Sequence, residues 1–270
     1  MNRRHFLRAG LSLTATLTTC DWVGAAVQGV YPSRPVEIIV PFAAGGPTDI
    51  LARFLSRSMT GELGQSFVII NRPGAGGNIG TQYVAHKPRD GYTVLLVASS
   101  YVINPSVYAD PQYDPIADFS PISRVGSGPF VLTVRKELPV HTVADLIALA
   151  KQRPGPVTYA SAGVGTANHL AGELFKQITG VNMVHVPYNG AAPASQALLM
   201  GTVDLLFNNM LSGLPMIRAD QVRAVAVTGP KRSPALPELP TVIESGVPGF
   251  DVQTWYALLA PAGLDIDIRK

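Results

Sequence analysis

The sequence predicts an α/β fold with largely parallel sheets. Short runs rich in β-branched residues alternate with helical patterns along most of the chain, and strands separated by helices are typical of such sheets. Two proline-rich stretches, 104–123 and 229–240, bound a compact α/β block of roughly a hundred residues. A block between two extended connections suggests an inserted second domain. The chain would leave the first domain before this block and return to it afterwards.

The elements of the first part follow in order. VEIIV at 36–40 is the first predicted strand, FVIIN at 67–71 the second, and YTVLLVAS at 92–99 a long apolar strand of the kind covered on both faces. A helix near 79–86 follows the second strand. The helix after the first strand repeats apolar residues close to the 3.6-residue period: Ile50, Leu51, Phe54, Leu55 and Met59.

The inserted block repeats the alternation. PFVLTVRKE at 129–137 is a predicted strand, and Thr142 with Asp145 forms a capping box that opens a helix ending at Lys151. The later predicted elements are the strands VTYA (157–160), MVHVPY (183–188), VDLLFNN (203–209) and VRAVAVT (222–228), with helices over 167–177 and 192–200.

Composition and charge exclude two broad classes of protein. Hydrophobic residues make up 47% of the 270-residue chain and charged residues 14%, which excludes a disordered chain. The formal net charge is +3, and residues 1–26 contribute +2 of it through Arg3, Arg4 and Arg8 against Asp21. No run of lysine or arginine remains elsewhere, so we expect no nucleic-acid binding.

Residues 1–26 are predicted to be an export signal peptide. A basic start is followed by the weakly apolar stretch 9–19 and by small residues at 24–26, which suit cleavage. The stretch 3–7, Arg-Arg-His-Phe-Leu, resembles the twin-arginine signal, and an ordinary Sec signal is the alternative. The apolar stretch is shorter than the ~20 residues that a membrane span needs.

Cys20 is the one cysteine of the chain, and it lies inside the predicted signal. Cleavage after Ala26 would leave a chain without cysteine, which suits an oxidising compartment and excludes disulfides and cysteine metal sites. A lipoprotein box at 17–20 is an alternative reading, but Thr19 before the cysteine is a poor fit.

Three glycine loops lie between a predicted strand and a predicted helix: PFAAGGPTD (41–49), RPGAGGN (72–78) and SAGVGT (161–166). None is a nucleotide motif, because Ile79 stands where the dinucleotide fingerprint needs glycine and Gly-Lys-Ser/Thr is absent. At such positions the free N–H groups and the helix dipole bind an anion without a charged side chain. Tight turns alone would explain one such loop, but three favour a shared ligand cleft.

Catalytic signals are few. The sequence has no Gly-x-Ser-x-Gly elbow and no His-Glu-x-x-His helix, so we expect no catalysis, no metal and no cofactor. Of the five histidines, His169 faces the expected cleft and His185 is expected in the core. Asp49 stands in a first helical turn, where a carboxylate complements the dipole. A hydrolase using the Ser161 loop and His169 is the enzymatic alternative.

Several motifs carry a family resemblance. YPSRPVEIIVPFAAGGPTDILARFLS, VIINRPGAGGNIGTQYVA, YASAGVGTANHLAGELF and VPYNGAAPASQALLMGTVDLLF resemble the Bug/TctC-type substrate-binding proteins of tripartite tricarboxylate transporters, in register over 31–263. The resemblance implies a type II periplasmic-binding-protein fold, with two lobes joined by a hinge. It also implies a monomeric periplasmic receptor that closes over a small carboxylate and delivers it to a membrane permease. An extracytoplasmic sensor with another protein partner is the alternative.

The resemblance also sets domain boundaries and a site. We expect the signal at 1–26, lobe 1 at 27–128 and 234–270, and lobe 2 at 129–233. The resemblance implies that the first loop binds a ligand carboxylate and that the other lobe completes the site. The expected ligand-binding residues are Phe42, Ala44, Gly45, Gly46, Thr48, Asp49, Gly76, Asn78, Ser99, Ser161, Gly163, Gly165, Thr166, His169, Tyr188 and Asn189.

The sequence departs from the family pattern in three places. Asn189 replaces a lysine, which removes a positive charge near the expected cleft, and Asn208 replaces an aspartate. LDIDIRK (264–270) stands in place of a longer helical tail that packs on the first lobe in the family. We therefore expect this 270-residue form to be less stable than its relatives.

Overall fold

The computed structural model describes residues 31–269. The predicted signal at 1–26, with its paired arginines and Cys20, lies outside the described residues. In the described part, no helix is both long enough and apolar enough to cross a bilayer.

The first half of the fold is a parallel sheet with a helix on each face. Strands β1 (Val36–Val40), β2 (Phe67–Asn71) and β3 (Thr93–Ala98) pair in the order β2-β1-β3. Helix α1 (Pro47–Leu63) packs on the face that contains Ile38, and α2 (Asn78–Ala85) on the face that contains Ile39. Both isoleucines are fully buried, so β1 is covered on both sides, as its apolar sequence predicts.

The second half repeats this arrangement. Its strands are β5 (Val157–Ser161), β6 (Met183–Pro187), β7 (Leu205–Asn209) and β8 (Val222–Val227), and its helices are α4 (Val143–Gln152), α5 (Ala167–Thr179), α6 (Ala191–Leu199) and α7 (Met210–Arg218). β5 pairs in parallel with β6 and β7. Phe175, Phe207 and Phe250 contact one another at the centre of the core. The predicted capping box opens α4, because Thr142 and Asp145 bond reciprocally.

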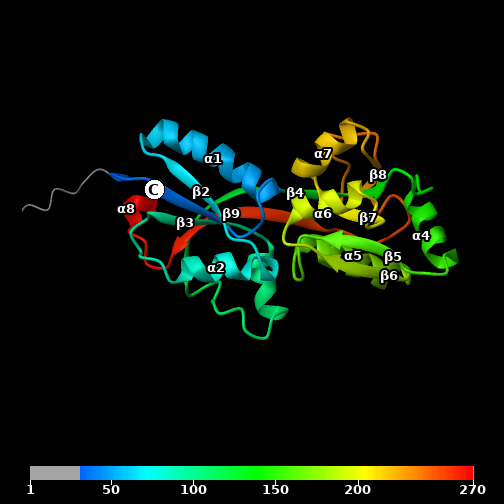
Figure 1. The fold of residues 1–270 in the computed structure, drawn as a ribbon, viewed down its shortest axis with the longest axis horizontal. Coiled ribbons are helices and arrows are strands. Elements are labelled where there is room, and N and C mark those ends of the chain that lie inside the picture. Colours follow the sequence, from blue (N-terminus) through cyan, green and yellow to red (C-terminus); the bar gives the residue numbers. More distant parts are fainter. Residues whose placement is uncertain (1–30, 270) are drawn as a thin grey trace, which may run out of the picture. The chain divides into compact units, whose positions relative to one another are not determined.

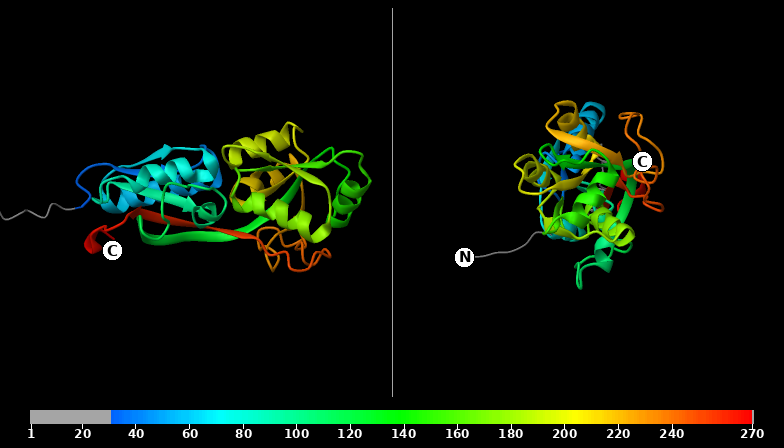
Figure 2. Two further views of the ribbon diagram at one scale, coloured as in Figure 1. Left: turned by 90° about the horizontal axis from the view of Figure 1, so that it is seen from below. Right: turned by 90° about the vertical axis from the view of Figure 1, so that its right-hand side faces the viewer.

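Two long strands connect the halves. β4 (Phe119–Arg135) and β9 (Gln253–Pro261) pair antiparallel from Phe119–Pro261 to Pro129–Gln253, and Figure 1 shows them running side by side from one half to the other. β9 also pairs with β3, and the far end of β4 pairs with β7 and β8. In the view from below in Figure 2, the two strands run along one side of both halves.

The α/β class is confirmed, and the sheet is mixed rather than largely parallel. Every antiparallel pair between named strands contains β4 or β9. β4 begins inside the stretch 104–123, which the prolines had marked as a connection. Shifts in register near Pro121 and Arg124 let the strand accommodate a proline and turn between the halves.

Short elements complete the fold: α3 (Ser100–Ile103), the 3-10 turns η1 (Ala75–Gly77) and η2 (Asn104–Ser106), and α8 (Ile266–Arg269). The segment before β9 packs on the second half, since Val242, Val247 and Phe250 belong to its core. The lobe boundaries remain a prediction. The packing of this segment favours a return of the chain to the first half at β9 rather than at 229–240.

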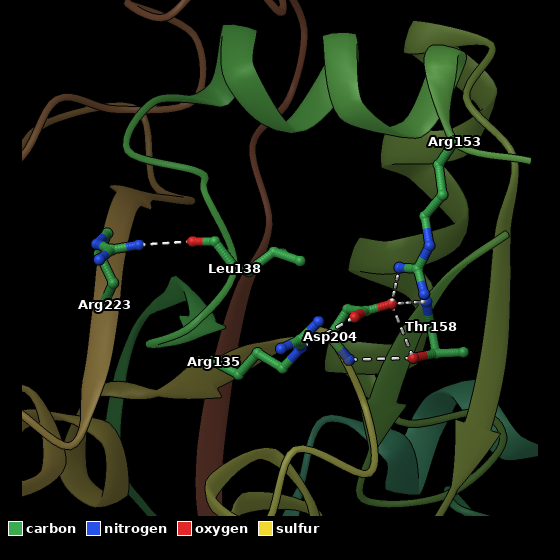
Figure 3. A network of polar contacts seen from close by, with 6 residues as sticks. All are labelled: Arg135, Leu138, Arg153, Thr158, Asp204 and Arg223. Carbon is green, nitrogen blue, oxygen red and sulfur yellow. Dashed lines mark hydrogen bonds and ion pairs between the residues drawn. The ribbon is translucent and has the colours of Figure 1, made fainter. Parts of the chain in front are cut away.

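Asp204 joins three strand ends in the second half (Figure 3). Its carboxylate accepts hydrogen bonds from Arg153 Nη1 at 2.7 Å, Thr158 N at 3.0 Å and Arg135 Nε at 3.1 Å. Burial by itself would raise the pKa of Asp204, but the Thr158 N–H and the two guanidinium groups outweigh it and hold the pKa below its usual value. The ionised carboxylate therefore stabilises the ends of β4 and β5 against the start of β7.

Candidate ligand-binding cavity

The loop between β1 and α1 presents a helix start without a charged side chain. Gly46 is the N-cap of α1 in an extended conformation, and Pro47 follows it without an N–H. The N–H groups of Thr48 and Asp49 precede the first intrahelical hydrogen bond, which runs from Ile50 N to Gly46 O at 2.9 Å. They are available to a ligand, together with the positive end of the helix dipole.

Asp49 holds the first glycine loop in place. Its carboxylate accepts from Gly45 N at 3.0 Å, Arg53 Nε at 2.8 Å and Asn71 Nδ2 at 3.0 Å. Burial would raise the pKa of Asp49, but these donors outweigh it and lower the pKa. The ionised side chain thus holds the glycine loop against α1 and β2, as expected for an acidic residue in a first helical turn.

Four helices of nine or more residues begin at one cavity. Its lining includes Thr48 from α1, Thr166 and Asn168 from α5, Ala191 from α6, and Asn209, which caps α7. α1 belongs to the first half of the fold and the other three helices to the second. The N-termini of helices from both halves therefore face one space, where their dipoles favour an anion.

No lysine, arginine, histidine, aspartate or glutamate lines this cavity within residues 31–269. The space inside it that the centres of water-sized spheres can reach is about 40 Å³. The wall combines apolar side chains with a few polar ones, as in most small-molecule sites. The lining residues are Phe42, Gly46, Pro47, Thr48, Ala98, Ser99, Ser100, Phe130, Ala162, Thr166, Ala167, Asn168, Ala191, Asn209, Thr254 and Tyr256.

Loops of the two halves contact each other beside the cavity. Ala43 N donates to Asn189 O at 3.2 Å, and Tyr108 Oη donates to Val164 O at 3.1 Å. Gly76 has φ +63°, and a Cβ on it would lie 2.3 Å from Val164 O. Such contact requires glycine, so the structure represents a closed arrangement of the halves.

The structure brings five of the predicted ligand-binding residues into the lining: Phe42, Gly46, Thr48, Ser99 and Thr166. Others take part in the contact between the halves, notably Gly76 and Gly163, whose backbones approach closely. The predicted residues outside the lining are Ala44, Gly45, Asp49, Gly76, Asn78, Ser161, Gly163, Gly165, His169, Tyr188 and Asn189.

Ser161 and His169 do not form a catalytic pair. Ser161 is fully buried, and its Oγ lies 2.6 Å from His185 Nε2 and accepts from Gly163 N at 3.0 Å. His169 Nδ1 accepts from Gly165 N at 3.3 Å. These contacts fix the loop before α5 and leave the serine without access to the cavity. The geometry therefore does not support the hydrolase alternative.

His185 and His169 lie against each other with ring centroids 4.2 Å apart. Burial lowers the pKa of His185 to about 4, and the neighbouring His169 adds to the effect. Burial also lowers the pKa of His169, against the opposing charge of Glu173. Both rings are therefore neutral at pH 7, and His185 takes part in a hydrogen bond with Ser161.

The two asparagines that depart from the family pattern lie outside the cavity lining. Asn208 is buried in β7, and its Oδ1 accepts from Ser212 Oγ at 3.0 Å. Asn189 is exposed, and its backbone carbonyl bonds to the first loop. Neither side chain adds a charge to the cavity.

Sequence reasoning missed several lining residues, among them Asn168, Asn209, Thr254 and Tyr256. Thr254 and Tyr256 belong to β9, a strand that was not predicted. Asn209 could have been found, because asparagine directly after a predicted strand is a typical N-cap, and its Oδ1 accepts from Leu211 N at 3.0 Å.

Two halves that are linked by two strands and close over a cavity of helix N-termini define a two-lobed solute-binding protein. The chain belongs to the family described as tripartite tricarboxylate transporter family receptor (TctC), whose sequence profile matches residues 51–270. This is a family of binding proteins, not of enzymes.

Known relatives agree with this assignment. The chain is 41% identical to protein BugT of Bordetella pertussis, over 87% of this chain and 73% of BugT. The solved structure of R. palustris Rpa4515 with adipate matches at 43% identity and a TM-score of 0.86, over 88% of this chain and 80% of the other. MatC (Rpa3494) from Rhodopseudomonas palustris with bound malate matches at 32% identity and a TM-score of 0.84, over 88% and 82%.

Proposed function

We propose that this protein is a periplasmic receptor that captures a small carboxylate and delivers it to the membrane permease of a tripartite tricarboxylate-type transporter. The observation that carries the proposal is a cavity lined by the starts of four helices of nine or more residues and by no charged side chain in the described part of the chain. The adipate and malate bound in the two solved relatives support a carboxylate as the ligand. Export through the predicted signal is part of this proposal.

The carboxylate is held by backbone donors. The N–H groups of Thr48 and Asp49 and those of the first turn of α5 lack intrahelical partners, and glycine at position 46 lets an oxygen approach the backbone closely. Each charge-assisted hydrogen bond contributes about 1.5–3 kcal/mol. Two or three such bonds in a water-poor cavity supply affinity without an arginine or a lysine.

Capture involves closure of the two halves. β4 and β9 are the connections through which the halves can move, and the loops around Gly76 and Gly163 meet when they close. The ligand contacts helix starts from both halves, so its binding favours the closed arrangement. Release to the permease then requires reopening, which exposes the carboxylate to water.

Four measurements test the proposal. Mass spectrometry of small molecules released from protein purified from its native host is expected to give a carboxylic acid. Calorimetry with that acid is expected to show one site per chain, and no ester hydrolysis is expected with activated esters. Capture of an uncharged solute, or turnover of an ester, would contradict the proposal. Pull-down with permease subunits against a sensor kinase separates transport from signalling.

A further inference from the structure

The third glycine loop, SAGVGT, is bonded to two imidazole rings, which we name the histidine pair: His169 and His185. His169 Nδ1 accepts from Gly165 N at 3.3 Å, and His185 Nε2 lies 2.6 Å from Ser161 Oγ. The serine oxygen in turn accepts from Gly163 N at 3.0 Å. Contacts that involve the histidine pair therefore fix the backbone of the loop at both of its glycines.

The same loop forms part of the cavity wall. Ala162 and Thr166 line the cavity, and Thr166 is the N-cap of α5, so the free N–H groups of that helix follow it directly. The hydroxyl and the N–H of Thr166 both donate to Gly163 O. A change in the backbone at Gly163 or Gly165 is therefore transmitted to the donors that α5 presents to a ligand.

The bond from Gly165 to His169 requires an uncharged ring. Because His169 Nδ1 is the acceptor, the neutral ring has its hydrogen on Nε2, and a further proton is added at Nδ1. Two N–H groups would then face each other, and the bond would be lost. The ring centroids of the histidine pair lie 4.2 Å apart, so a charge on His185 would also repel a charge on His169.

In the described part of the chain, three other ionisable groups face the histidine pair: Tyr159 from β5, and Glu173 and Lys176 from α5. Burial raises the pKa of Tyr159 well above its usual value, so its hydroxyl keeps the proton. Burial would raise the pKa of Glu173 too, but Tyr159 and Lys176 outweigh it and lower that pKa. Lys176 Nζ lies 2.9 Å from the Glu173 carboxylate, which compensates its charge. Between about pH 5 and 7.5 the change of charge therefore comes from the imidazoles.

We propose that the histidine pair makes carboxylate binding depend on pH, because a proton on the pair breaks the bonded form of the third glycine loop and weakens the hold of α5 on the carboxylate. This inference rests on the proposed function, in which the first turn of α5 donates to the ligand. Burial lowers the pKa of both rings, so the bonded loop belongs to the uncharged pair. Proton binding and carboxylate binding oppose each other, and each weakens the other by the same factor.

Calorimetry with adipate and with malate at pH 7.5 and at pH 5 tests the proposal on the full chain. His169→Asn keeps an acceptor near the position of Nδ1, and His185→Gln keeps a polar group near the position of Nε2, but neither side chain titrates. His141→Gln is the matched control, because His141 is exposed and lies outside the histidine pair. The acids themselves gain protons at pH 5, and this contribution cancels when the proteins are compared with one another.

The expected result is a steeper loss of affinity with acid when the histidine pair is intact. The ratio of Kd at pH 5 to Kd at pH 7.5 is expected to be about threefold or more larger in the unmodified protein and in His141→Gln than in His169→Asn or His185→Gln. Thermal melting at both pH values checks that each protein is folded.

NMR of the imidazole C–H groups gives a second readout on the unmodified protein, which does not depend on any variant folding. Two histidine resonances are expected to titrate at a pH lower by about half a pH unit or more when adipate is bound, since the bound form disfavours the proton. The remaining histidines are expected to titrate alike with and without adipate.

The outcomes separate this inference from the proposed function. The same acid dependence in all four proteins, or histidine midpoints that bound adipate leaves unchanged, would overturn the inference and leave the function standing. A smaller loss of affinity with acid in the unmodified protein than in His169→Asn and His185→Gln would also overturn it, because attraction between an imidazolium and the carboxylate would then outweigh the change in the loop. Failure to bind adipate, malate or the acid released from the native protein at pH 7.5 would overturn the function and the inference together.

Discussion

Gly76 and Val164 meet between the two halves of the protein, so closely that a Cβ on the glycine would lie 2.3 Å from the valine carbonyl oxygen. Gly163 approaches the same glycine from the second half, since a Cβ on Gly163 would lie 3.2 Å from Gly76 Cα. The glycines of the second and third loops thus allow the two halves to approach each other closely.

Gly76→Ala is expected to weaken ligand binding about tenfold or more, because the closed arrangement becomes less populated and the apparent affinity falls with that population. Calorimetry with the acid released from the native protein measures the effect. Gly61→Ala in α1 is the control, since a Cβ there meets nothing within 4 Å. Unchanged affinity in Gly76→Ala would show that closure does not need this contact.

Gly46→Val tests the first loop separately from closure. Gly46 has φ −81°, and a Cβ there would lie 3.5 Å from Ala43 O and 3.8 Å from Ala191 Cβ, which are ordinary contacts. The variant is therefore expected to melt near the unmodified protein. Its branched side chain keeps the carboxylate away from the N–H groups of α1, so we expect affinity to fall by about 1.4 kcal/mol or more, a tenfold change. Full affinity would place the carboxylate elsewhere.

Asp204→Asn is expected to lower the free energy of unfolding by on the order of 2–3 kcal/mol, because it removes charge-assisted bonds from Arg135 and Arg153 at a buried site. Urea denaturation gives the value. Asp220→Asn removes an exposed partner of Lys136 and is expected to change stability by less than about 1 kcal/mol. Similar losses in the two variants would contradict the role given to the Asp204 network.

The histidine pair predicts a dependence of stability on pH. The pKa of His185 is about 4 in the folded protein and about 6.5 in the unfolded chain. Between these values the unfolded chain binds a proton that the folded protein does not, so the free energy of unfolding falls as pH falls from 6.5 toward 4. His169 acts in the same direction, because its pKa is also lowered.

His185→Gln keeps a polar partner for Ser161 and removes the titration. Urea denaturation at several pH values between 7 and 4.5 is expected to show a smaller loss of stability with acid in this variant than in the unmodified protein. Carboxylates with lowered pKa values, such as Asp49 and Asp204, contribute at lower pH, because an aspartate of the unfolded chain has a pKa of about 3.9 and that of the folded protein a lower one. A loss as steep as in the unmodified protein would contradict the assignment to His185.

Local pattern predicted much of the fold. The strands 36–40 and 67–71 have the predicted bounds, and the capping box of α4 is present. The two connecting strands were harder to find, because Pro121 and exposed polar residues hide the start of β4 and because β9 follows an irregular segment. Their pairing joins residues more than a hundred positions apart, which no local pattern encodes.

The candidate site, like the fold, could be predicted only in part from local sequence patterns. Loops that lie at a strand end and a helix start could be recognised from glycine and capping residues, and this identified Gly46, Thr48 and Thr166. Which loop residues face the cavity depends on how the halves meet, and Gly76 and Gly163, two of the expected ligand-binding residues, lie outside the lining and approach each other. Thr254 and Tyr256 enter the site only through the unpredicted strand β9.

The central claim is that helix N-termini, without a charged side chain, recognise the negative charge of the ligand. Calorimetry with the acid released from the native protein and with its amide, in which each carboxylate becomes an uncharged group of similar shape, tests this claim most directly. We expect the amide to bind on the order of 100-fold more weakly, since at least two charge-assisted hydrogen bonds lose their charge. Equal affinity for the acid and the amide would contradict the account.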